Sequence, residues 1–241
     1  MNNVITQEVI LLEINDLSAN ENDCIIKVMS ENGIFNLLAK GINKAHSKNR
    51  ANLLIGQLIN IEYFPSRYFH SLSKLKKATL LTTLDYKRND LLEFIIKISN
   101  FLNAFTFNKT TKIFFEYKNI INHISQLSST ELNFVKTYLL MQGLSDLGIE
   151  PIFNGCHICS SREKISNFDF YNGGFECYKH NQNVFLSSKI LELIYYCKFN
   201  YDKYIKLVSI EIDTFIYQHL LTHYERHGIY LSWDQKVKIK I

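Results

Sequence analysis

The sequence predicts an α+β protein, in which an N-terminal OB-type β-barrel is followed by a helical domain with a zinc-ribbon-like insert. Short β-rich segments fill the first third of the chain. Apolar residues recur at helical spacing from Asp90 onward. Two pairs of metal-ligating residue types follow. We expect an OB-fold domain over residues 1–82 and a helical domain over residues 83–241, with the insert at about 152–185.

The predicted strands are short and bounded by turn signals. They are Val4-Ile5 with Val9–Ile14, Cys24–Met29, Ile34–Ala39, Leu58–Phe64 and Leu72–Leu81. Asn32-Gly33 is a hairpin signal between the second and third strands. About five short strands at this spacing suit a small barrel of the OB type. The polar, basic segment Gly41–Asn52 is predicted to be a loop.

Four helices are predicted in the remainder of the chain. The first has an apolar face made of Leu91, Ile95, Ile98 and Leu102. The second begins at a capping box formed by Ser128 and Glu131, and it ends before Gly148 and Pro151. The last two are predicted over Ser188–Phe199 and Lys206–Arg226.

A metal site is predicted from the pattern C-x2-C-x17-C-x2-H, whose ligands are Cys156, Cys159, Cys177 and His180. Each x2 pair lets two side chains of one tight turn reach the same ion. Four protein ligands favour one structural Zn²⁺, because a catalytic zinc keeps a position open. The alternative is that these are buried free cysteines and a surface histidine. Cys24 and Cys197 lie on apolar faces and are predicted to be core residues.

Positive charge is concentrated in one part of the sequence. Between Lys40 and Lys77, eight basic residues face the single acid Glu62, which gives a net charge of +7 within a chain of net charge +4. This stretch predicts a surface that binds a polyanion. The predicted DNA-binding residues are Lys40, Lys44, Lys48, Arg50, Arg67, Lys74, Lys76 and Lys77.

Aromatic residues lie beside these cations. Tyr63, Phe64, Tyr68 and Phe69 flank Arg67, and exposed aromatic rings next to cations suit stacking on unpaired bases. The alternative interpretation is a solvated basic loop with core aromatics. Barrel, loop and charge together favour nucleic acid.

The sequence contains none of the common hydrolytic motifs that we considered, namely H-E-x-x-H, G-x-S-x-G and the phosphate-binding loop. His219, His223 and His227 recur every four residues on one predicted helix, and we expect them to form a partly exposed face. We also expect no membrane-spanning helix, no signal peptide and a cytoplasmic location. The protein is therefore predicted not to be an enzyme. A zinc hydrolase and an RNA-binding or ribosome-associated zinc protein are the alternatives.

The order of these parts resembles the bacterial RecO family of DNA repair proteins. The likeness lies in Asn22–Ile26, in Gly33–Gly41 with the basic run to Arg50, in Gly148–Cys159 and in Gly173–Cys177. The ending His223–Ser232 is also similar. The chain departs from the family in having Ile42-Asn43 before the first lysine of the loop and His180 where the fourth ligand is commonly Cys.

The resemblance implies an OB domain, a helical domain and a zinc-binding insert. It implies binding of single- and double-stranded DNA, annealing of complementary strands, and help in loading recombinase onto DNA coated by single-strand-binding protein. The implied partners are RecR and the C-terminal tail of single-strand-binding protein. The implied location is the nucleoid.

Overall fold

The computed structural model describes residues 3–18, 20–68, 70–105, 108–181 and 184–231. Contacts between residues divide the chain into two compact units, one formed by the described residues up to Leu127 and the other by Ser128–Leu231. The first unit contains the strands of the barrel and the two helices that follow them. The sequence predicts a domain boundary between residues 82 and 83, where the pattern of strands ends, and this boundary stays a prediction.

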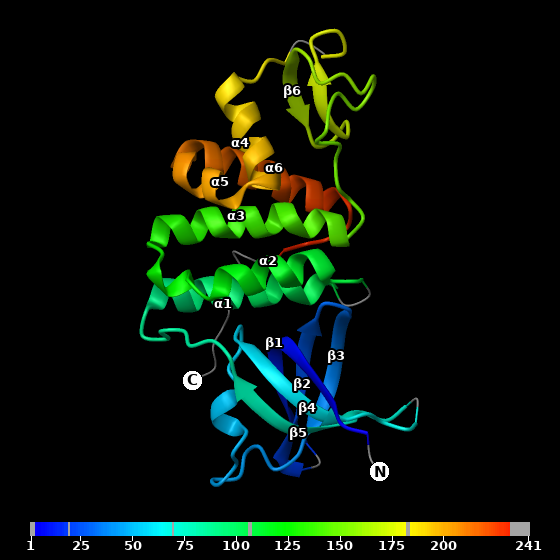
Figure 1. The fold of residues 1–241 in the computed structure, drawn as a ribbon, viewed down its shortest axis with the longest axis vertical. Helices are drawn as coiled ribbons and strands as arrows, with labels where there is room; N and C mark the ends of the chain where they lie inside the picture. Colours follow the sequence, from blue (N-terminus) through cyan, green and yellow to red (C-terminus); the bar gives the residue numbers. More distant parts are fainter. Residues whose placement is uncertain (1–2, 19, 69, 106–107, 182–183, 232–241) are drawn as a thin grey trace. The chain divides into compact units, whose positions relative to one another are not determined.

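The first unit is built on a five-stranded closed barrel with the strand order β1-β2-β3-β5-β4 (Figure 1). Neighbouring strands are antiparallel except β3 and β5, which are parallel. The strands are β1 (Ile5–Leu17), β2 (Asn20–Ser30), β3 (Gly33–Ala39), β4 (Leu58–Phe64) and β5 (Ser73–Leu80).

Strand β1 is continuous, whereas the sequence pattern predicts two separate segments at this place. Its first half, Ile5–Ile10, pairs with β4, and its second half pairs with β2. The polar residues Gln7 and Glu8 lie inside the strand because they pair with Ile61 and Asn60 of β4. One long strand therefore serves two neighbours and closes the barrel.

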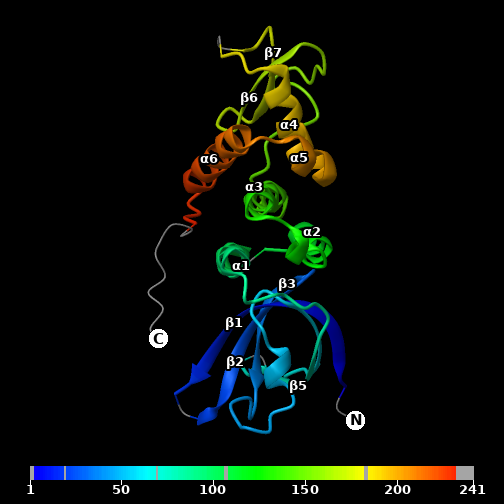
Figure 2. The same cartoon turned by 90° about the vertical axis from the view of Figure 1, so that its left-hand side faces the viewer.

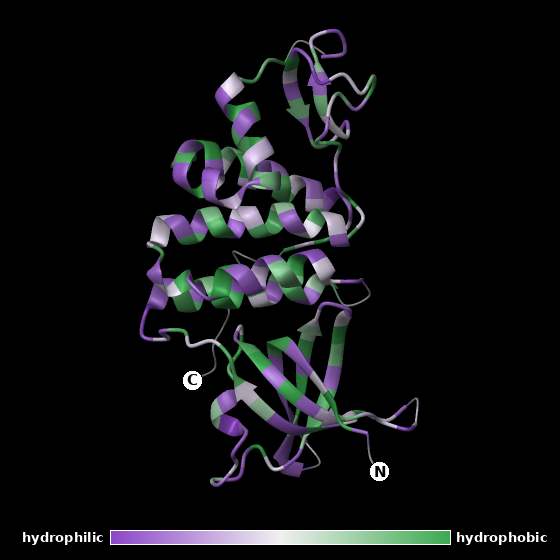
Figure 3. Cartoon of the chain, viewed as in Figure 1, coloured by the Kyte–Doolittle hydropathy of each residue, from purple (hydrophilic) through white to green (hydrophobic). Residues whose placement is uncertain are grey.

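The barrel encloses an apolar core. Along the strands hydrophobic and polar residues alternate, as Figure 3 shows, because successive side chains point to opposite faces. The buried residues include Val9, Ile26, Leu37, Ile59 and Ala78. Cys24 is fully buried in the same core, as predicted.

Helices α1 (Asn89–Leu102) and α2 (Thr111–Ile121) lie side by side over one end of the barrel (Figures 1 and 2). The α1 face predicted from the spacing is buried. Helix α2 is not predicted from the sequence, because it is rich in β-branched and aromatic residues that have low helix propensity. Tertiary contacts hold it instead, including a hydrogen bond of 2.7 Å from the Tyr117 hydroxyl to the Gly56 carbonyl.

The second unit is organised around α3 (Ser129–Asp146), which is buried along most of its length. The predicted capping box is present, since the Glu131 N–H donates to Ser128 Oγ at 3.3 Å and the Ser128 N–H donates to Glu131 Oε2 at 2.8 Å. Helices α4 (Ser188–Phe199), α5 (Tyr201–Leu207) and α6 (Ile210–Arg226) pack against α3. Among the described residues, no helix is long and apolar enough to span a bilayer.

The helix predicted over Lys206–Arg226 is wrong in one respect, because it is two helices. Val208 adopts an extended conformation between α5 and α6. Ser209 then caps α6 by accepting the N–H of Ile212. A serine whose side chain accepts this hydrogen bond stabilises the first turn of a new helix, which favours two separate helices over one continuous helix.

Between α3 and α4 the chain forms a small antiparallel sheet of β6 (Ile165–Asp169) and β7 (Gly174–Cys177). Its apolar side is a group of aromatic rings in which Phe153 stacks on Phe168 with centroids 5.0 Å apart. The segment before β6 is joined to β7 through hydrogen bonds at Ile152 and His157. This arrangement places the two ends of the Cys/His pattern next to each other.

Candidate nucleic-acid interface and metal centre

All eight predicted DNA-binding residues belong to the barrel unit, and all of them are exposed. They come from the segment after β3, the β4–β5 connection and β5, and the structure divides them into three groups. Lys48 and Arg50 flank Asn49, whose side chain is hydrogen-bonded to the β5 backbone at Lys76 and Ala78, on either side of Lys77. Arg67 and Lys74 share a pocket. Lys40 and Lys44 flank the turn that begins at Gly41.

A bulge in β5 turns two consecutive lysines outward. In a regular strand Lys76 and Lys77 would point to opposite faces, so one of them would point into the barrel. The pairing shifts between Glu62 and Tyr63, so that Glu62 pairs with Lys77 and Tyr63 pairs with Leu75. The extra residue restores Ala78 to the core and leaves both lysines exposed.

Part of this charge is compensated. Lys76 Nζ lies 2.7 Å from Glu62 Oε2 on the neighbouring strand. This hydrogen bond, together with the nearby Lys76 and Lys77 charges, lowers the pKa of the Glu62 carboxyl. One cation of the four-residue group of Lys48, Arg50, Lys76 and Lys77 is therefore paired with an acid, Glu62, that lies outside the group.

Asparagine side chains fix the basic loop to β5. Asn49 Oδ1 accepts the Ala78 N–H at 3.0 Å, and Asn49 Nδ2 donates to the Lys76 carbonyl at 3.3 Å. Asn52 Oδ1 accepts the Leu80 N–H at 3.3 Å. These side-chain amides bond to backbone groups of β5 that a neighbouring strand would otherwise pair with. The loop that carries Lys48 and Arg50 therefore lies along β5, the strand that carries Lys76 and Lys77.

The start of the same loop is held by acids of the β1–β2 hairpin. Asp23 Oδ1 accepts the Gly41 N–H at 2.7 Å, and Asn43 Nδ2 donates to Asp16 Oδ1 at 3.0 Å. In the sequence, Asp23 stands out only as part of the family-like segment Asn22–Ile26. Its contact with Gly41 joins residues 18 positions apart, and no local pattern reveals it.

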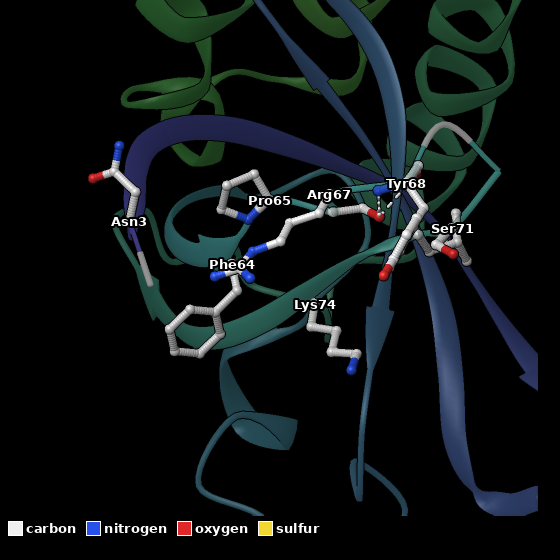
Figure 4. Close-up of a pocket in the computed structure, with 9 residues that line it drawn as sticks. Asn3, Phe64, Pro65, Arg67, Tyr68, Ser71 and Lys74 are labelled. Atoms are coloured by element: carbon white, nitrogen blue, oxygen red, sulfur yellow. Dashed lines mark hydrogen bonds between the residues drawn. The ribbon is translucent and has the colours of Figure 1, made fainter. Parts of the chain in front are cut away.

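A pocket of about 580 Å³ lies at the β4–β5 connection (Figure 4). In the view of Figure 4, Phe64 and Tyr68 lie on opposite sides of it, with Lys74 between them. Tyr63 instead packs against the barrel core. Phe69 lies outside the described residues. The pocket is lined by Asn3, Phe64, Pro65, Ser66, Arg67, Tyr68, Ser71, Leu72 and Lys74.

The four predicted metal ligands come together at one end of the β6–β7 sheet. Their ligand atoms all lie within 4.8 Å of one another. Cys156 Sγ and Cys177 Sγ lie 3.5 and 3.4 Å from His180 Nδ1, and the Sγ atoms of Cys159 and Cys177 lie 3.8 Å apart. Ligand atoms of a tetrahedral zinc with Cys and His ligands are separated by roughly 3.5–3.8 Å. The cluster therefore fits one metal ion.

Local backbone structure supports the ligands. Cys156 is fully buried, and its burial opposes ionisation. Backbone N–H groups of Cys177, Cys159 and Ile158, together with the His180 side chain, outweigh this effect and lower the pKa of the Cys156 thiol to about 6. A thiol in these surroundings is prepared for the thiolate form that binds metal.

Gly174 allows the two halves of the centre to approach each other. A Cβ at this position would lie 2.2 Å from the Ile152 carbonyl oxygen, and its φ of +136° is one that side chains disfavour. Across this contact the Phe175 N–H donates to the Ile152 carbonyl at 3.1 Å, and the Ile152 N–H donates to the Gly173 carbonyl at 2.7 Å. The second glycine of the Gly-Gly pair before Cys177 is therefore required by backbone packing.

The other cysteines and histidines do not join the cluster. Cys197 is fully buried in α4, as predicted. His157 lies beside the buried Glu176, with Nε2 3.5 Å from Oε1. The histidine face on α6 is partly exposed, as predicted, and within it His223 is buried and donates a 2.7 Å hydrogen bond to the Ile149 carbonyl. His219 and His227 are exposed.

Comparison with known proteins relates this arrangement to one family. The model of the N-terminal domain of recombination protein O matches residues 1–84, and that of its C-terminal domain matches residues 107–197. The DNA repair protein RecO of Mesoplasma florum is 31% identical over 171 residues, which cover 68% of this chain and 63% of that protein. The DNA repair protein RecO of Caldanaerobacter subterraneus is 29% identical over 127 residues, covering 48% of this chain and 51% of the relative.

The chain thus spans between one half and two thirds of the length of these curated relatives. Among solved structures, asparaginyl-tRNA synthetase of Entamoeba histolytica is similar with a TM-score of 0.29 and 12% identity, over 63% of this chain and 34% of that one. That likeness is too weak to carry an argument. The two family models together match well over half of the sequence, in the expected order, and on that basis the chain belongs to the RecO (recombination protein O) family.

Proposed function

We propose that this protein is a DNA repair and recombination mediator that binds single- and double-stranded DNA and anneals complementary strands. The observation that carries the proposal is the set of eight exposed cations on the barrel unit, part of which is fixed to β5 by Asn49 and Asn52. The strand order, with its parallel β3–β5 pairing, supports an OB-type barrel. Barrels of this type bind oligonucleotides. Two relatives are named DNA repair proteins.

The charge distribution suits annealing. Two strands repel each other through their phosphates, and a protein that covers the bases tightly prevents pairing. Cations on a polar loop neutralise phosphates and leave base edges free. Lys44, Lys48 and Arg50 have this character, since all three are exposed in the segment between β3 and β4.

The proposed role of the second unit is structural and is carried by one Zn²⁺ at Cys156, Cys159, Cys177 and His180. The spacing of the ligand atoms supports this assignment. The ion would join the Cys156 turn to the end of β7 and stabilise a zinc-ribbon-like insert. With four protein ligands the ion has no open position, so we propose no hydrolytic chemistry for it.

The proposed partners follow from the family. They are RecR, the C-terminal tail of single-strand-binding protein, and the DNA that this protein coats, onto which recombinase is loaded. The proposed location is the cytoplasm, at the nucleoid.

The test is a triple charge reversal, Lys44→Glu, Lys48→Glu and Arg50→Glu, assayed for DNA binding across a salt series and for annealing rate. We expect affinity and annealing to fall, and the log–log salt slope on single strands to shrink by about 0.7 per lost contact. The matched control reverses Lys189, Lys203 and Lys206, three exposed lysines of the second unit. Equal behaviour of the two triple variants would refute the proposal.

Competition between single-stranded DNA and RNA of the same sequence tests the alternative of an RNA-binding protein. DNA binding that survives an excess of RNA is the expected result. Hydrolysis of ATP or cutting of DNA by the purified protein, lost on mutation of its own residues, would overturn the non-enzymatic role.

A further inference from the structure

The pocket at the β4–β5 connection combines two kinds of side chain. Arg67 and Lys74 bring positive charge to it, and Phe64 and Tyr68 bring aromatic rings (Figure 4). Its volume of about 580 Å³ is in the range of pockets that hold a small organic group. The pocket lies on the barrel unit, which also carries the other six predicted DNA-binding residues.

Tyr68 is exposed to solvent, and its backbone is held by hydrogen bonds to two serines. Its side chain is 77% exposed. Its N–H donates to Ser66 Oγ at 3.1 Å, and its carbonyl accepts from the Ser66 hydroxyl at 2.9 Å and from the Ser71 N–H at 3.1 Å. A tyrosine on a fixed backbone loses only two side-chain torsions when a ligand covers it.

The same backbone is joined to β5. The Ser66 N–H donates to Ser73 Oγ at 3.0 Å, and Ser73 directly precedes Lys74. The backbone at Tyr68 is therefore joined by hydrogen bonds to the start of β5, where Lys74 lies. The pocket thus differs from the basic loop. The loop is joined to β5 by the amide side chains of Asn49 and Asn52, whereas the pocket adds aromatic rings to its cations.

We propose that this pocket binds one unpaired nucleotide of a single DNA strand, with the base stacked on Tyr68 and the adjacent phosphate contacted by Lys74 and Arg67. A flat, uncharged ring that is linked through a sugar to a phosphate is the ligand that an aromatic face beside two cations fits best. A base within a duplex is stacked on both faces, so neither face is free to stack on the Tyr68 ring. The pocket therefore favours single strands, whereas phosphate contacts of the basic loop do not distinguish paired from unpaired DNA.

This inference rests on the proposed function, because the strand must first be held by the barrel. The experiment uses the full chain with three fluorescent probes of equal length: a single strand, a strand of abasic sites and a duplex. Tyr68→Ala is expected to weaken binding of the intact single strand roughly 5- to 150-fold, which is the usual loss for one stacked base. Affinity for the abasic strand and the duplex stays as in the parent protein.

Two further variants complete the test. Tyr68→Phe keeps the ring and restores binding of the single strand. Tyr230→Ala removes a tyrosine that is 80% exposed in the second unit and leaves all three affinities unchanged. Since the Tyr68 side chain buries little surface, the thermal unfolding curve of Tyr68→Ala should match that of the parent.

The outcomes separate this inference from the proposed function. An equal loss on all three probes, or no loss on the intact strand, overturns the nucleotide pocket. If the Lys44/Lys48/Arg50 reversal weakens binding of all probes in the same experiment, the proposed function stands by itself. A parent protein that binds none of the probes overturns both.

Discussion

The hydroxyl of Tyr204 donates a hydrogen bond of 2.7 Å to Oδ1 of Asp213, joining α5 to α6 inside the second unit. Tyr204 is fully buried, and Asp213 is 5% exposed. Burial is the main cause that raises the pKa of the Asp213 carboxyl to about 6, against the opposing effects of Tyr204, Thr137 and Lys136. Asp213 thus binds its proton more tightly in the folded protein than in the unfolded chain.

The sign of the resulting pH dependence follows from this difference. Between pH 4 and pH 6 the folded state holds more protons at Asp213, so stability falls as the pH rises through this range and levels off above it. Asp213→Asn keeps the acceptor for Tyr204 and removes the titration. The free energy of unfolding of the parent minus that of the variant should fall by about 2 kcal/mol from pH 4 to pH 7.

Chemical denaturation at four pH values measures this difference. Metal ligands titrate equally in both proteins, so their contribution cancels. If the free energies of unfolding of the parent and of Asp213→Asn change with pH in parallel, the Asp213 carboxyl has the same pKa in the folded and the unfolded protein, and the prediction is wrong.

Gly56 is a second position with a calculable effect, because the barrel and the helices meet there. Its φ is +77°, and a Cβ would lie 2.4 Å from Ile95 Cγ2 of α1. Its N–H and carbonyl are both bonded, to the Leu11 carbonyl at 2.7 Å and to the Tyr117 hydroxyl at 2.7 Å. Gly56→Ala is expected to destabilise the barrel unit by about 3 kcal/mol, as left-handed strain adds to overpacking.

The matched control for this prediction is Gly41→Ala. Gly41 has a similar φ of +65°, but its Cβ would meet only the Lys44 side chain at 3.5 Å. Strain alone should lower stability by about 1 kcal/mol in this variant. Equal denaturation midpoints for the two variants would show that the Ile95 side chain moves away from the new methyl group without loss of stability.

The third prediction concerns the metal. Protein purified without chelator should contain one equivalent of zinc, and Cys156→Ser should lose it because three remaining ligands bind zinc weakly. The second unit should lose stability as well, while DNA binding through the barrel largely survives. Elemental analysis and urea unfolding give the two readouts. Cys197→Ala removes a buried thiol of the same unit that is not a ligand, and it should retain the metal.

Local patterns in the sequence predict those parts of the fold that local chemistry determines. The α3 capping box is confirmed because Ser128 and Glu131 satisfy each other's backbone groups within one turn. β-Rich runs bounded by turn signals predict β3, β4 and β5 to within one residue at each end, whereas the predicted Cys24–Met29 covers only the second part of β2. The Cys/His spacing names four side chains whose ligand atoms the structure brings within 4.8 Å.

Features that depend on distant contacts could not be predicted in this way. Helix α2 has aromatic and β-branched residues that favour strands, and its packing on the barrel end decides its conformation. The buried position of His223 depends on the Ile149 carbonyl, 74 residues away. The β5 bulge appears in the sequence as a pair of lysines, and only the pairing with β4 shows that both face outward.

The last prediction concerns such a distant contact, the hydrogen bond between Asp23 and the Gly41 N–H. Asp23→Ala removes the acceptor, so the backbone at the start of the basic loop should open more easily. A hydrogen bond to a carboxylate contributes about 1.5–3 kcal/mol, and we expect the Gly41 amide to exchange with solvent at least tenfold faster. Asp23→Asn keeps an oxygen acceptor and removes the charge, so it should protect Gly41 nearly as well as the parent. Hydrogen exchange followed by NMR measures this amide directly. Equal protection of Gly41 in Asp23→Ala and the parent would show that Gly41 φ and the Lys44 turn, rather than Asp23, hold the loop.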